Sequence, residues 1–191
     1  MLGFAHAIFR QSSKQMTDQI RTCVTQWYDF VTERLGREPR GFCDVSAFNK
    51  NGKPAVIRVS SVVDEKPFPT MFWLIDAEIS LKIDRLEAAG WIAKLQEMVN
   101  ESSAIKQQMK QAHEAHNTLR DRFLGEEERM LLHSRGMMSA LSDRGIGGIQ
   151  EPDRIRCLHT WYAAHMVEPN CVGGAVDQLM RSTEGFEWRL S

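Results

Sequence analysis

The chain has 191 residues, of which 42% are hydrophobic and 26% are charged, and its formal net charge is −1. This length can bury the core of a single domain without disulfides or metal, and the near-neutral charge argues against a broad nucleic-acid-binding face. The four cysteines include no Cys-x-x-Cys pair, which favours a reducing, cytoplasmic location over a disulfide scaffold. No run approaches the ~20 apolar residues that a membrane span needs.

An amphipathic helix over Thr17 to Leu35 is the first predicted element. Its apolar residues recur at helical spacing, and Gly36 can cap its end. Residues 1–16 are predicted to be an N-terminal extension, because their apolar opening is short and lacks the basic start and the small-residue cleavage site of a signal peptide. Met16 is an alternative start of the chain.

Between residues 42 and 75 the apolar pattern changes to the alternation of strands. The sequence Asn49-Lys-Asn-Gly predicts a hairpin turn, since glycine supplies the positive φ that such turns need. Asp64-Glu-Lys-Pro predicts a second turn, and Pro67 and Pro69 restrict the start of the last strand to an edge or a turn. The three strands, predicted to form an antiparallel meander, are Phe42–Phe48, Ala55–Val63 and Thr70–Ile75.

After Asp76 the apolar residues keep helical spacing nearly to the end of the chain. Ser102 or Ser103 can cap the longest helix. The predicted helices are Glu78–Ala89, Trp91–Val99, Ser102–Phe123, Glu126–Leu141, a helix that begins at Pro152, and Ala175–Arg181. The class is therefore α+β, a single domain over residues 17–181 in which a helical body packs on one face of a small three-stranded sheet. Residues 182–191 are predicted to be a tail that docks through Phe186 and Trp188.

The stretch from Glu151 to Asn170 is predicted to be a buried helix around which the rest of the chain packs. Pro152 suits the first helical position, where its missing N–H is not needed. Apolar side chains cover most of the girth of this helix, which is typical of a buried one. Arg154 is predicted to turn inward, where it needs an anion or a carboxylate such as that of Glu114, while Arg156 faces solvent.

A glycine-rich loop, Arg144-Gly-Ile-Gly-Gly-Ile, precedes this helix. Glycines allow the backbone to turn tightly or to approach a ligand, and a helix N-terminus attracts anions. With Arg154 and Arg156 in the first turn, Gly147 and Gly148 become candidates for an anion site. The same glycine pattern is common in plain turns, which is the alternative interpretation.

Three histidines are the candidate acid–base groups. His113 lies on a polar ridge with Arg120, and the ridge either meets a ligand or forms a structural hydrogen-bond pair. His116 falls inside the apolar stripe of the same helix and is predicted to be a core residue. The candidate catalytic residues are His113, His159 and His165, and the candidate ligand-binding residues are Arg120, Gly147, Gly148, Arg154 and Glu114.

Cys157 suggests two further chemistries, and helical geometry disfavours both. One candidate is a zinc ion held by Cys157, His159 and His165, with a fourth ligand such as His113. Helical geometry disfavours it, because His159 and His165 lie about 120° apart on the wheel of the Pro152 helix. A nucleophile–base pair of Cys157 and His159 is excluded on one helix, where they lie about 160° apart. The sequence thus predicts no metal, no cofactor and a core-filling role for Cys157.

Six motifs follow one another in order along the chain. They are Arg34-Leu-Gly-Arg-Glu-Pro-Arg-Gly, Lys53-Pro-Ala-Val-Ile, Phe68-Pro-Thr-Met-Phe-Trp-Leu, Arg85-Leu-Glu-Ala-Ala-Gly, Ala112-His-Glu-Ala-His, and Pro152-Asp-Arg-Ile-Arg-Cys-Leu-His followed by His165. Together, over roughly Thr17 to Met180, they resemble the bacterial family catalogued as domain of unknown function 501. The resemblance implies a cytoplasmic bacterial protein without an established activity. It matches recurring polar positions of the family to His113, Glu114, Arg120, Arg154, Cys157, His159 and His165.

The resemblance also implies cysteines that this chain lacks. Many members carry Cys-x-Cys-Gly at the hairpin, where this chain has Asn49-Lys-Asn-Gly, and Thr-Cys-Pro after the third strand, where it has Ile75-Asp-Ala. If those cysteines bind a metal together with the equivalent of Cys157, this chain has lost most of the ligands.

Two functions of different classes remain open. One is a protein that binds a small molecule or phosphate, or an enzyme acting on such a ligand, with a histidine as acid or base near neutral pH. The other is a non-catalytic structural or interaction protein whose His/Arg/Cys cluster fixes helix packing. Convergence of His113, Arg120, Arg154 and His159 on a solvent-reachable cavity favours the first, and separated or dry side chains favour the second.

Overall fold

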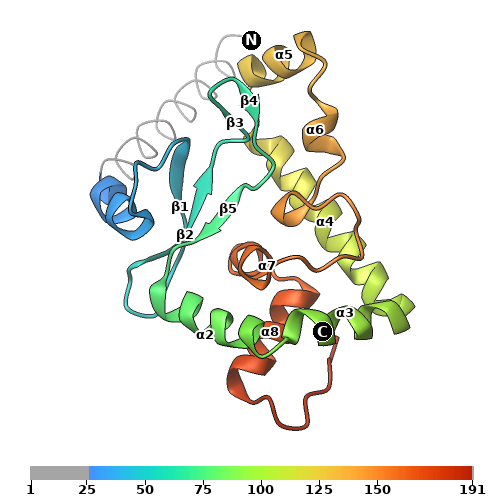
Figure 1. The fold of residues 1–191 in the computed structure, drawn as a ribbon. Helices are drawn as coiled ribbons and strands as arrows, with labels where there is room; N and C mark the ends of the chain where they lie inside the picture. Colours follow the sequence, from blue (N-terminus) through green and yellow to red (C-terminus); the bar gives the residue numbers. More distant parts are fainter. Residues whose placement is uncertain (1–25, 191) are drawn as a thin grey trace, which may run out of the picture.

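The computed structural model describes residues 26–190, which form a small antiparallel sheet set against a helical body (Figure 1). The sheet has the strand order β1–β2–β5, with β1 at Phe42–Phe48, β2 at Pro54–Val59 and β5 at Phe72–Leu74. Both strand pairs are antiparallel, so the predicted α+β class and three-stranded sheet are confirmed. The predicted extension over residues 1–16 and the first part of the helix predicted after it lie outside the described residues.

The central strand β2 is buried on both faces, because side chains alternate along a strand and each face meets its own apolar cluster. Val56 belongs to the main core, whereas Ile57 packs with Val31 of the helix over residues 26–35. The sequence predicted helices on one face only. In the structure this first helix covers the opposite face, so the sheet is the middle of three layers (Figure 1).

The hairpin turn between β1 and β2 is confirmed. The side-chain oxygen of Asn49 accepts the backbone N–H groups of Asn51 and Lys53. The second strand, predicted to reach Val63, ends at Val59 because the chain there leaves the sheet. The chain then forms a separate two-stranded sheet, in which β3, Val62–Val63, pairs with β4, Lys66–Pro67. Asp64 and Glu65 between them both have positive φ, as a tight two-residue turn requires.

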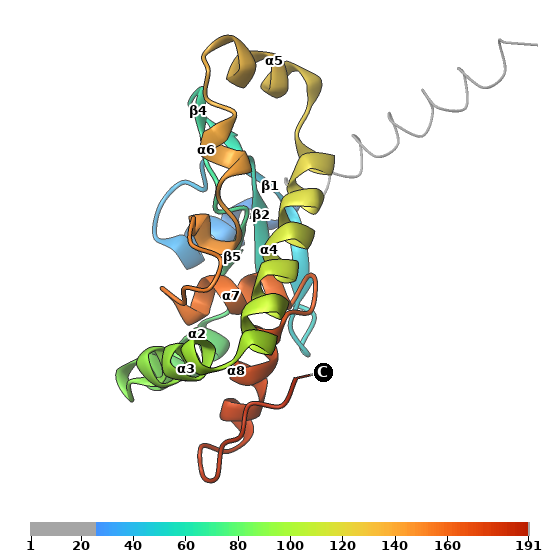
Figure 2. The same ribbon diagram turned by 90° about the vertical axis from the view of Figure 1, so that its right-hand side faces the viewer.

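Three helices follow the sheet close to their predicted positions: α2 at Ala77–Ala88, α3 at Trp91–Glu101 and α4 at Ser103–Phe123. Ser102 caps α4, because its hydroxyl accepts the N–H of Ile105. Gly90 separates α2 from α3 with a φ of 79°, a conformation that glycine adopts at little cost. Helices α2 and α3 lie near the beginning of α4, in the half of the molecule that also holds α8 (Figure 2).

The helix predicted over Glu126–Leu141 is instead two helices. They are α5 at Glu126–Ser134 and α6 at Ser139–Ser142. Gly136, with a φ of 64°, interrupts the helical path between them. Both helices lie at the end of α4 that is far from α2 and α3 (Figure 2). A single 3₁₀ turn, η1 at Ile146–Gly148, follows within the glycine-rich loop.

The helix predicted to begin at Pro152 begins at Leu158, and α7 spans Leu158–His165. The segment before it is not helical. The N–H of Arg154 closes a turn by donating to the carbonyl of Glu151, and side chains of other helices accept the next N–H groups. Gln96 of α3 accepts the N–H of Ile155 at 2.9 Å, and Glu87 of α2 accepts the N–H of Leu158 at 2.6 Å. Tertiary hydrogen bonds thereby replace the helical bonds that the sequence pattern predicted.

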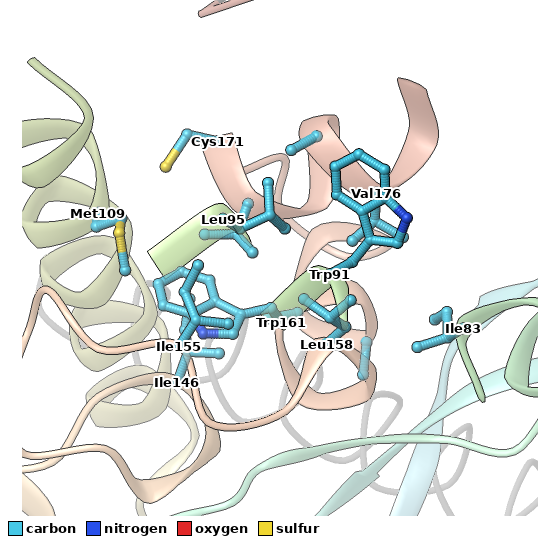
Figure 3. Close-up of a cluster of buried hydrophobic side chains, with 14 of the residues drawn as sticks. Ile83, Trp91, Leu95, Met109, Ile146, Ile155, Leu158, Trp161, Cys171 and Val176 are labelled. Atoms are coloured by element: carbon cyan, nitrogen blue, oxygen red, sulfur yellow. The ribbon is translucent and has the colours of Figure 1, made fainter. Parts of the chain in front are cut away.

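Helix α7 lies at the centre of the main core, as predicted for this stretch (Figure 1). Its Trp161 is fully buried, and Figure 3 shows it among side chains of α3, α4 and the loop before α7. Helix α8, Cys171–Arg181, begins earlier than predicted and packs along α7. The predicted docking of the tail is confirmed by Phe186, whose ring lies edge-on to Trp91 with a centroid distance of 5.2 Å.

Candidate functional site

Arg120 of α4 is a buried arginine whose hydrogen-bond partners all belong to the fold. The residue is 2% exposed, and burial lowers its pKa. Its guanidinium donates to four oxygens, those of the Pro69, Leu141 and Arg144 carbonyls and the Asn117 side chain. These bonds tie α4 to α6, to the loop after α6 and to the loop before β5, which is a structural role. They give no support to the predicted ligand contact.

The two histidines of α4 are neutral residues of the core. His113 is 6% exposed and accepts the backbone N–H of Ile146 through Nδ1 at 2.9 Å, and burial lowers its pKa to about 4. His116 lies edge-on to Phe72, and burial, aided by the charge of Arg120, lowers its pKa to about 3. The core position predicted for His116 is confirmed. His113 is likewise not poised for proton transfer near neutral pH.

The glycines of the loop are required by close packing against two helices. A Cβ atom at Gly145 would lie 2.0 Å from Nδ1 of His113, and one at Gly147 would lie 2.6 Å from Oγ1 of Thr160. Gly147 and Gly148 also have positive φ. The helix N-terminus that was expected to complete an anion site with these glycines lies elsewhere, because α7 begins well after the loop.

Three arginines nevertheless surround one pocket of about 320 Å³ in this region, which we call the arginine pocket. It is lined by Arg144, Ile149, Gln150, Glu151, Arg154 and Arg156. The prediction that Arg154 turns inward is wrong, since its side chain is 54% exposed and its Nε lies 3.6 Å from the Glu151 carboxylate. The helical wheel had placed Arg154 and Arg156 on opposite sides. Because this segment is not helical, both line the same pocket.

The residues that line the arginine pocket include three arginines and one glutamate. Arg144 donates one N–H to the Gly148 carbonyl at 3.2 Å, and most of its five N–H donors form no other bond to the described residues. Within residues 26–190, neither Arg144 nor Arg156 forms an ion pair with a carboxylate. Glu114, the partner considered for Arg154, instead lies 3.9 Å from Lys110 on the exposed face of α4.

A second cluster lies at the start of α7, where Cys157 approaches His159. Cys157 precedes the helix with extended backbone angles, φ −157° and ψ 126°, and its Sγ lies 3.8 Å from Nδ1 of His159. The prediction that these side chains cannot pair is therefore wrong, because it assumed that both belong to one helix. Glu87 of α2 completes the cluster, with its Oε1 3.3 Å from the same Nδ1.

The other ring nitrogen of His159 also faces oxygen atoms. Nε2 lies 3.3 Å from the Ser80 carbonyl and 3.3 Å from the Asp84 carboxylate, both on α2. The hydrogen bond to the Cys157 sulfur raises the pKa of His159 to about 9, with the charge of Glu87 adding and partial burial opposing. His159 also lines a pocket of about 250 Å³ between β5 and α7.

His165, at the end of α7, joins that helix to α8. Its Nδ1 accepts the N–H of Asn170 at 2.9 Å, and its Nε2 lies 3.3 Å from the Asp177 carboxylate. The three predicted catalytic histidines therefore have separate surroundings. His113 contacts the glycine-rich loop, His159 contacts α2, and His165 contacts α8.

A family model described as a protein of unknown function (DUF501) matches residues 45–178, well over half of the chain. The chain belongs to this family. No curated protein and no solved structure matches it. Across residues 26–190 of this DUF501 protein, no helix combines the length and the apolar character needed to cross a membrane. The arginine pocket and the Cys157 cluster both fall within the matched residues.

Sequence reasoning missed the part of the Cys157 cluster that comes from α2. Glu87 lies in Arg85-Leu-Glu-Ala-Ala-Gly, one of the motifs on which the DUF501 resemblance rests, and this motif was the one available signal. No periodicity within α2 indicates that Glu87 meets a residue 70 positions further along the chain. Arg144 was visible at the head of the glycine-rich loop, but its charge was not counted with those of Arg154 and Arg156.

The two places where the resemblance implies cysteines come together in the fold. Asn49 of the hairpin donates from its side chain to the Asp76 carboxylate at 2.6 Å. Asp76 also caps α2 by accepting the N–H of Ile79. In this chain, therefore, a hydrogen bond joins the positions that the resemblance assigns to cysteines.

Proposed function

We propose that this DUF501 protein binds a small molecule bearing a phosphate or carboxylate group in the arginine pocket. The observation that carries the proposal is the charge of the lining, three arginines against one glutamate, in a chain whose net charge is −1. Guanidinium groups bind both kinds of anion through paired N–H donors. The volume of about 320 Å³ falls at the lower end of the roughly 300–1,000 Å³ typical of small-molecule sites.

The backbone under the pocket is fixed by hydrogen bonds, which supports a binding role. Gln96 accepts the N–H of Ile155 and donates to the carbonyl of Asp153, both at 2.9 Å. On the other side of the pocket, the N–H of Gly145 donates to the carbonyl of Ile149 at 2.8 Å. A site whose backbone is ordered before the ligand arrives loses less conformational entropy on binding.

The proposal assigns binding to other residues than those the sequence favoured. His113, Arg120 and His165 bond within the fold and support the structural alternative for themselves. Arg154 remains as a predicted anion contact, and Arg144 and Arg156 join it. A reducing, cytoplasmic location accords with this proposal, since the cysteines among residues 26–190 are free thiols.

Thermal unfolding with added phosphate at constant ionic strength tests the proposal. We expect phosphate to raise the melting temperature of the wild-type protein, because a ligand at 100 times its dissociation constant adds ~2.7 kcal/mol to the free energy of unfolding. The double variant Arg154→Gln/Arg156→Gln should lose most of this shift. Both side chains are exposed, so the variant should fold with nearly wild-type stability in the absence of phosphate.

The matched control is Arg122→Gln, an exposed arginine at the end of α4 that lies outside the pocket. It should respond to phosphate like the wild type. Titration calorimetry with phosphate, and with a phosphorylated sugar as a larger probe, measures the same difference as an affinity. Equal responses of the double variant and the control would contradict the proposal, as would the absence of any response in the wild type.

A further inference from the structure

We infer that Cys157, His159 and Glu87 form a zinc site at the start of α7. One ligand atom from each residue, a sulfur, a nitrogen and an oxygen, lies within 4.8 Å of the others. These are the three kinds of ligand atom that zinc takes in proteins. The site is separate from the arginine pocket, and the inference does not depend on the proposed function.

The separations from Nδ1 of His159 to the other two ligand atoms are close to those of a tetrahedral zinc ion. Ligands held at the usual 2.0–2.3 Å from a tetrahedral zinc lie about 3.3–3.6 Å from one another. In the structure, Nδ1 of His159 lies 3.3 Å from the Glu87 carboxylate and 3.8 Å from Sγ of Cys157. The third pair, Sγ of Cys157 and the Glu87 carboxylate, lies within 4.8 Å. One ion can contact all three atoms once this pair closes to the tetrahedral separation.

The hydrogen bonds around His159 direct Nδ1 toward a cation. Nε2–H donates to the Ser80 carbonyl, which can only accept, and the Asp84 carboxylate lies at the same distance. Nδ1 then faces a carboxylate and a sulfur, two acceptor groups, so this position suits either a proton on Nδ1 or a metal ion. Zinc-bound histidines commonly have this arrangement, with the second ring nitrogen held by a carbonyl or a carboxylate.

A hydrogen bond to the backbone also fixes the carboxylate of Glu87. Its Oε1 accepts the backbone N–H of Leu158 at 2.6 Å, which fixes the carboxylate beside the start of α7. The cluster thus has both the ligand atoms and the surrounding bonds that orient them. A thiolate and an imidazole favour zinc over magnesium or calcium, which bind oxygen ligands.

Three protein ligands leave the fourth position of a tetrahedral ion open. Among residues 26–190, no further His, Cys, Asp or Glu joins the group. Zinc sites with three protein ligands bind water or a substrate at the fourth position, whereas structural sites are closed by four. Of the three ligand residues, His159 alone also lines the pocket of about 250 Å³ between β5 and α7.

This ligand set differs from the one that sequence reasoning disfavoured. His165 and His113 have other partners, and Glu87 takes the place of both. The angular objection to Cys157 and His159 disappears because Cys157 precedes the helix. The expectation of a metal-free protein is therefore replaced by a testable expectation of one zinc ion per chain.

Titration of the chelator-treated full-length protein with zinc and with cobalt tests the inference. We expect one ion of either metal to bind per chain. Bound cobalt should show a sulfur-to-metal charge-transfer band and the intense visible bands of tetrahedral coordination. Cys157→Ser should remove the charge-transfer band, and Glu87→Gln, which keeps an oxygen for the N–H of Leu158, should weaken zinc binding by at least about tenfold.

Cys43→Ser is the matched control. Cys43 is also a half-buried free thiol, but its Sγ bonds to the Gly41 carbonyl, away from the cluster. This variant should keep the cobalt spectrum and the zinc affinity of the wild type. Circular dichroism of each metal-free variant verifies that the compared proteins are folded.

Two results would overturn the inference. One is a wild-type protein that binds neither metal stoichiometrically, which would mean that a proton occupies Nδ1 of His159. The other is a Cys157→Ser variant with unchanged zinc affinity and an unchanged cobalt spectrum. A phosphate response that persists in Cys157→Ser would show that the two sites are independent.

Discussion

Burial separates two groups of polar side chains that the sequence treated as one site. Arg120 and His113 are 2% and 6% exposed and bond to the backbone of neighbouring loops, so their polarity serves packing. Arg154 and Arg156 are exposed on a non-helical segment and line a pocket. The Arg120 guanidinium already has its partners in the fold, so redirecting it toward a ligand costs free energy. His113 bonds to the fold through Nδ1, and its Nε2 is buried without a partner among residues 26–190.

The buried histidines make the stability depend on pH. The pKa of His116 is lowered to about 3 and that of His113 to about 4, both by burial first, and Arg120 adds to the shift at His116. Between those values and the ordinary 6.5, the unfolded chain binds more protons than the folded one. The stabilisation is therefore complete above pH 6.5 and is lost as the pH falls.

We expect His116→Leu to flatten this dependence. The wild type should lose on the order of 3 kcal/mol through His116 alone between pH 6.5 and pH 4. Urea unfolding at a series of pH values measures the slope. His133→Gln is the control, because His133 is exposed on α5 and should leave the slope unchanged. Parallel slopes for His116→Leu and the wild type would mean that His116 does not stay neutral in the folded state.

At the scale of elements, the start of α7 decides which side chains can meet. Gln96 of α3 and Glu87 of α2 bond to the backbone of the segment before α7 and hold it in a non-helical conformation. Cys157 can then turn toward His159, and the arginines on either side of Ile155 can share one pocket. Two helices distant in sequence thus determine the geometry of both candidate sites.

Removing the amide of Gln96 should loosen this segment. Gln96→Ala eliminates the hydrogen bonds to Ile155 and Asp153, and an exposed one to Asn100, and should lower the free energy of unfolding by about 1–3 kcal/mol. We expect faster hydrogen exchange at the amide of Ile155 and weaker phosphate binding. Gln107→Ala on the exposed side of α4 is the control. Unchanged exchange at Ile155 would show that the non-helical segment does not need Gln96.

At the scale of the whole molecule, one apolar core joins α7 to one face of the sheet and to the helices α2, α3, α4 and α8. It includes Val56 of β2. Figure 3 shows three of its other members, Leu95 of α3, Met109 of α4 and Trp161 of α7. Since these elements share one cluster, they should unfold together. Both candidate sites then depend on the stability of the same core.

Substitutions of two leucines test whether the elements that share this core unfold together. Leu95 is fully buried in the core, and Leu95→Ala should lower the free energy of unfolding by about 2–5 kcal/mol. Leu81 of α2 is 50% exposed, and Leu81→Ala should change it by less than about 0.5 kcal/mol. In both variants, unfolding followed by tryptophan fluorescence and by circular dichroism should give one coincident transition. Separate transitions would mean that the sheet and the helices are independent units.

The sequence by itself determined the features that depend on neighbours in the chain. The strand β1, the turn at Asn49, the break at Gly90 and the cap at Ser102 follow from alternation, turn residues and capping side chains, which act over a few positions. The α+β class follows from the order of these elements. The central position of α7 was also readable, because its girth is apolar.

Only the tertiary structure decided where α7 begins and what gathers around its start. Pro152 and the apolar periodicity favour a helix there, and hydrogen bonds from Gln96 and Glu87, 59 and 71 positions away, outweigh that local preference. A helical wheel assumes a continuous helix, so its error at Cys157 carried over to every pairing inferred from it. Contacts between distant segments leave no periodic signal in the chain, and both candidate sites depend on such contacts.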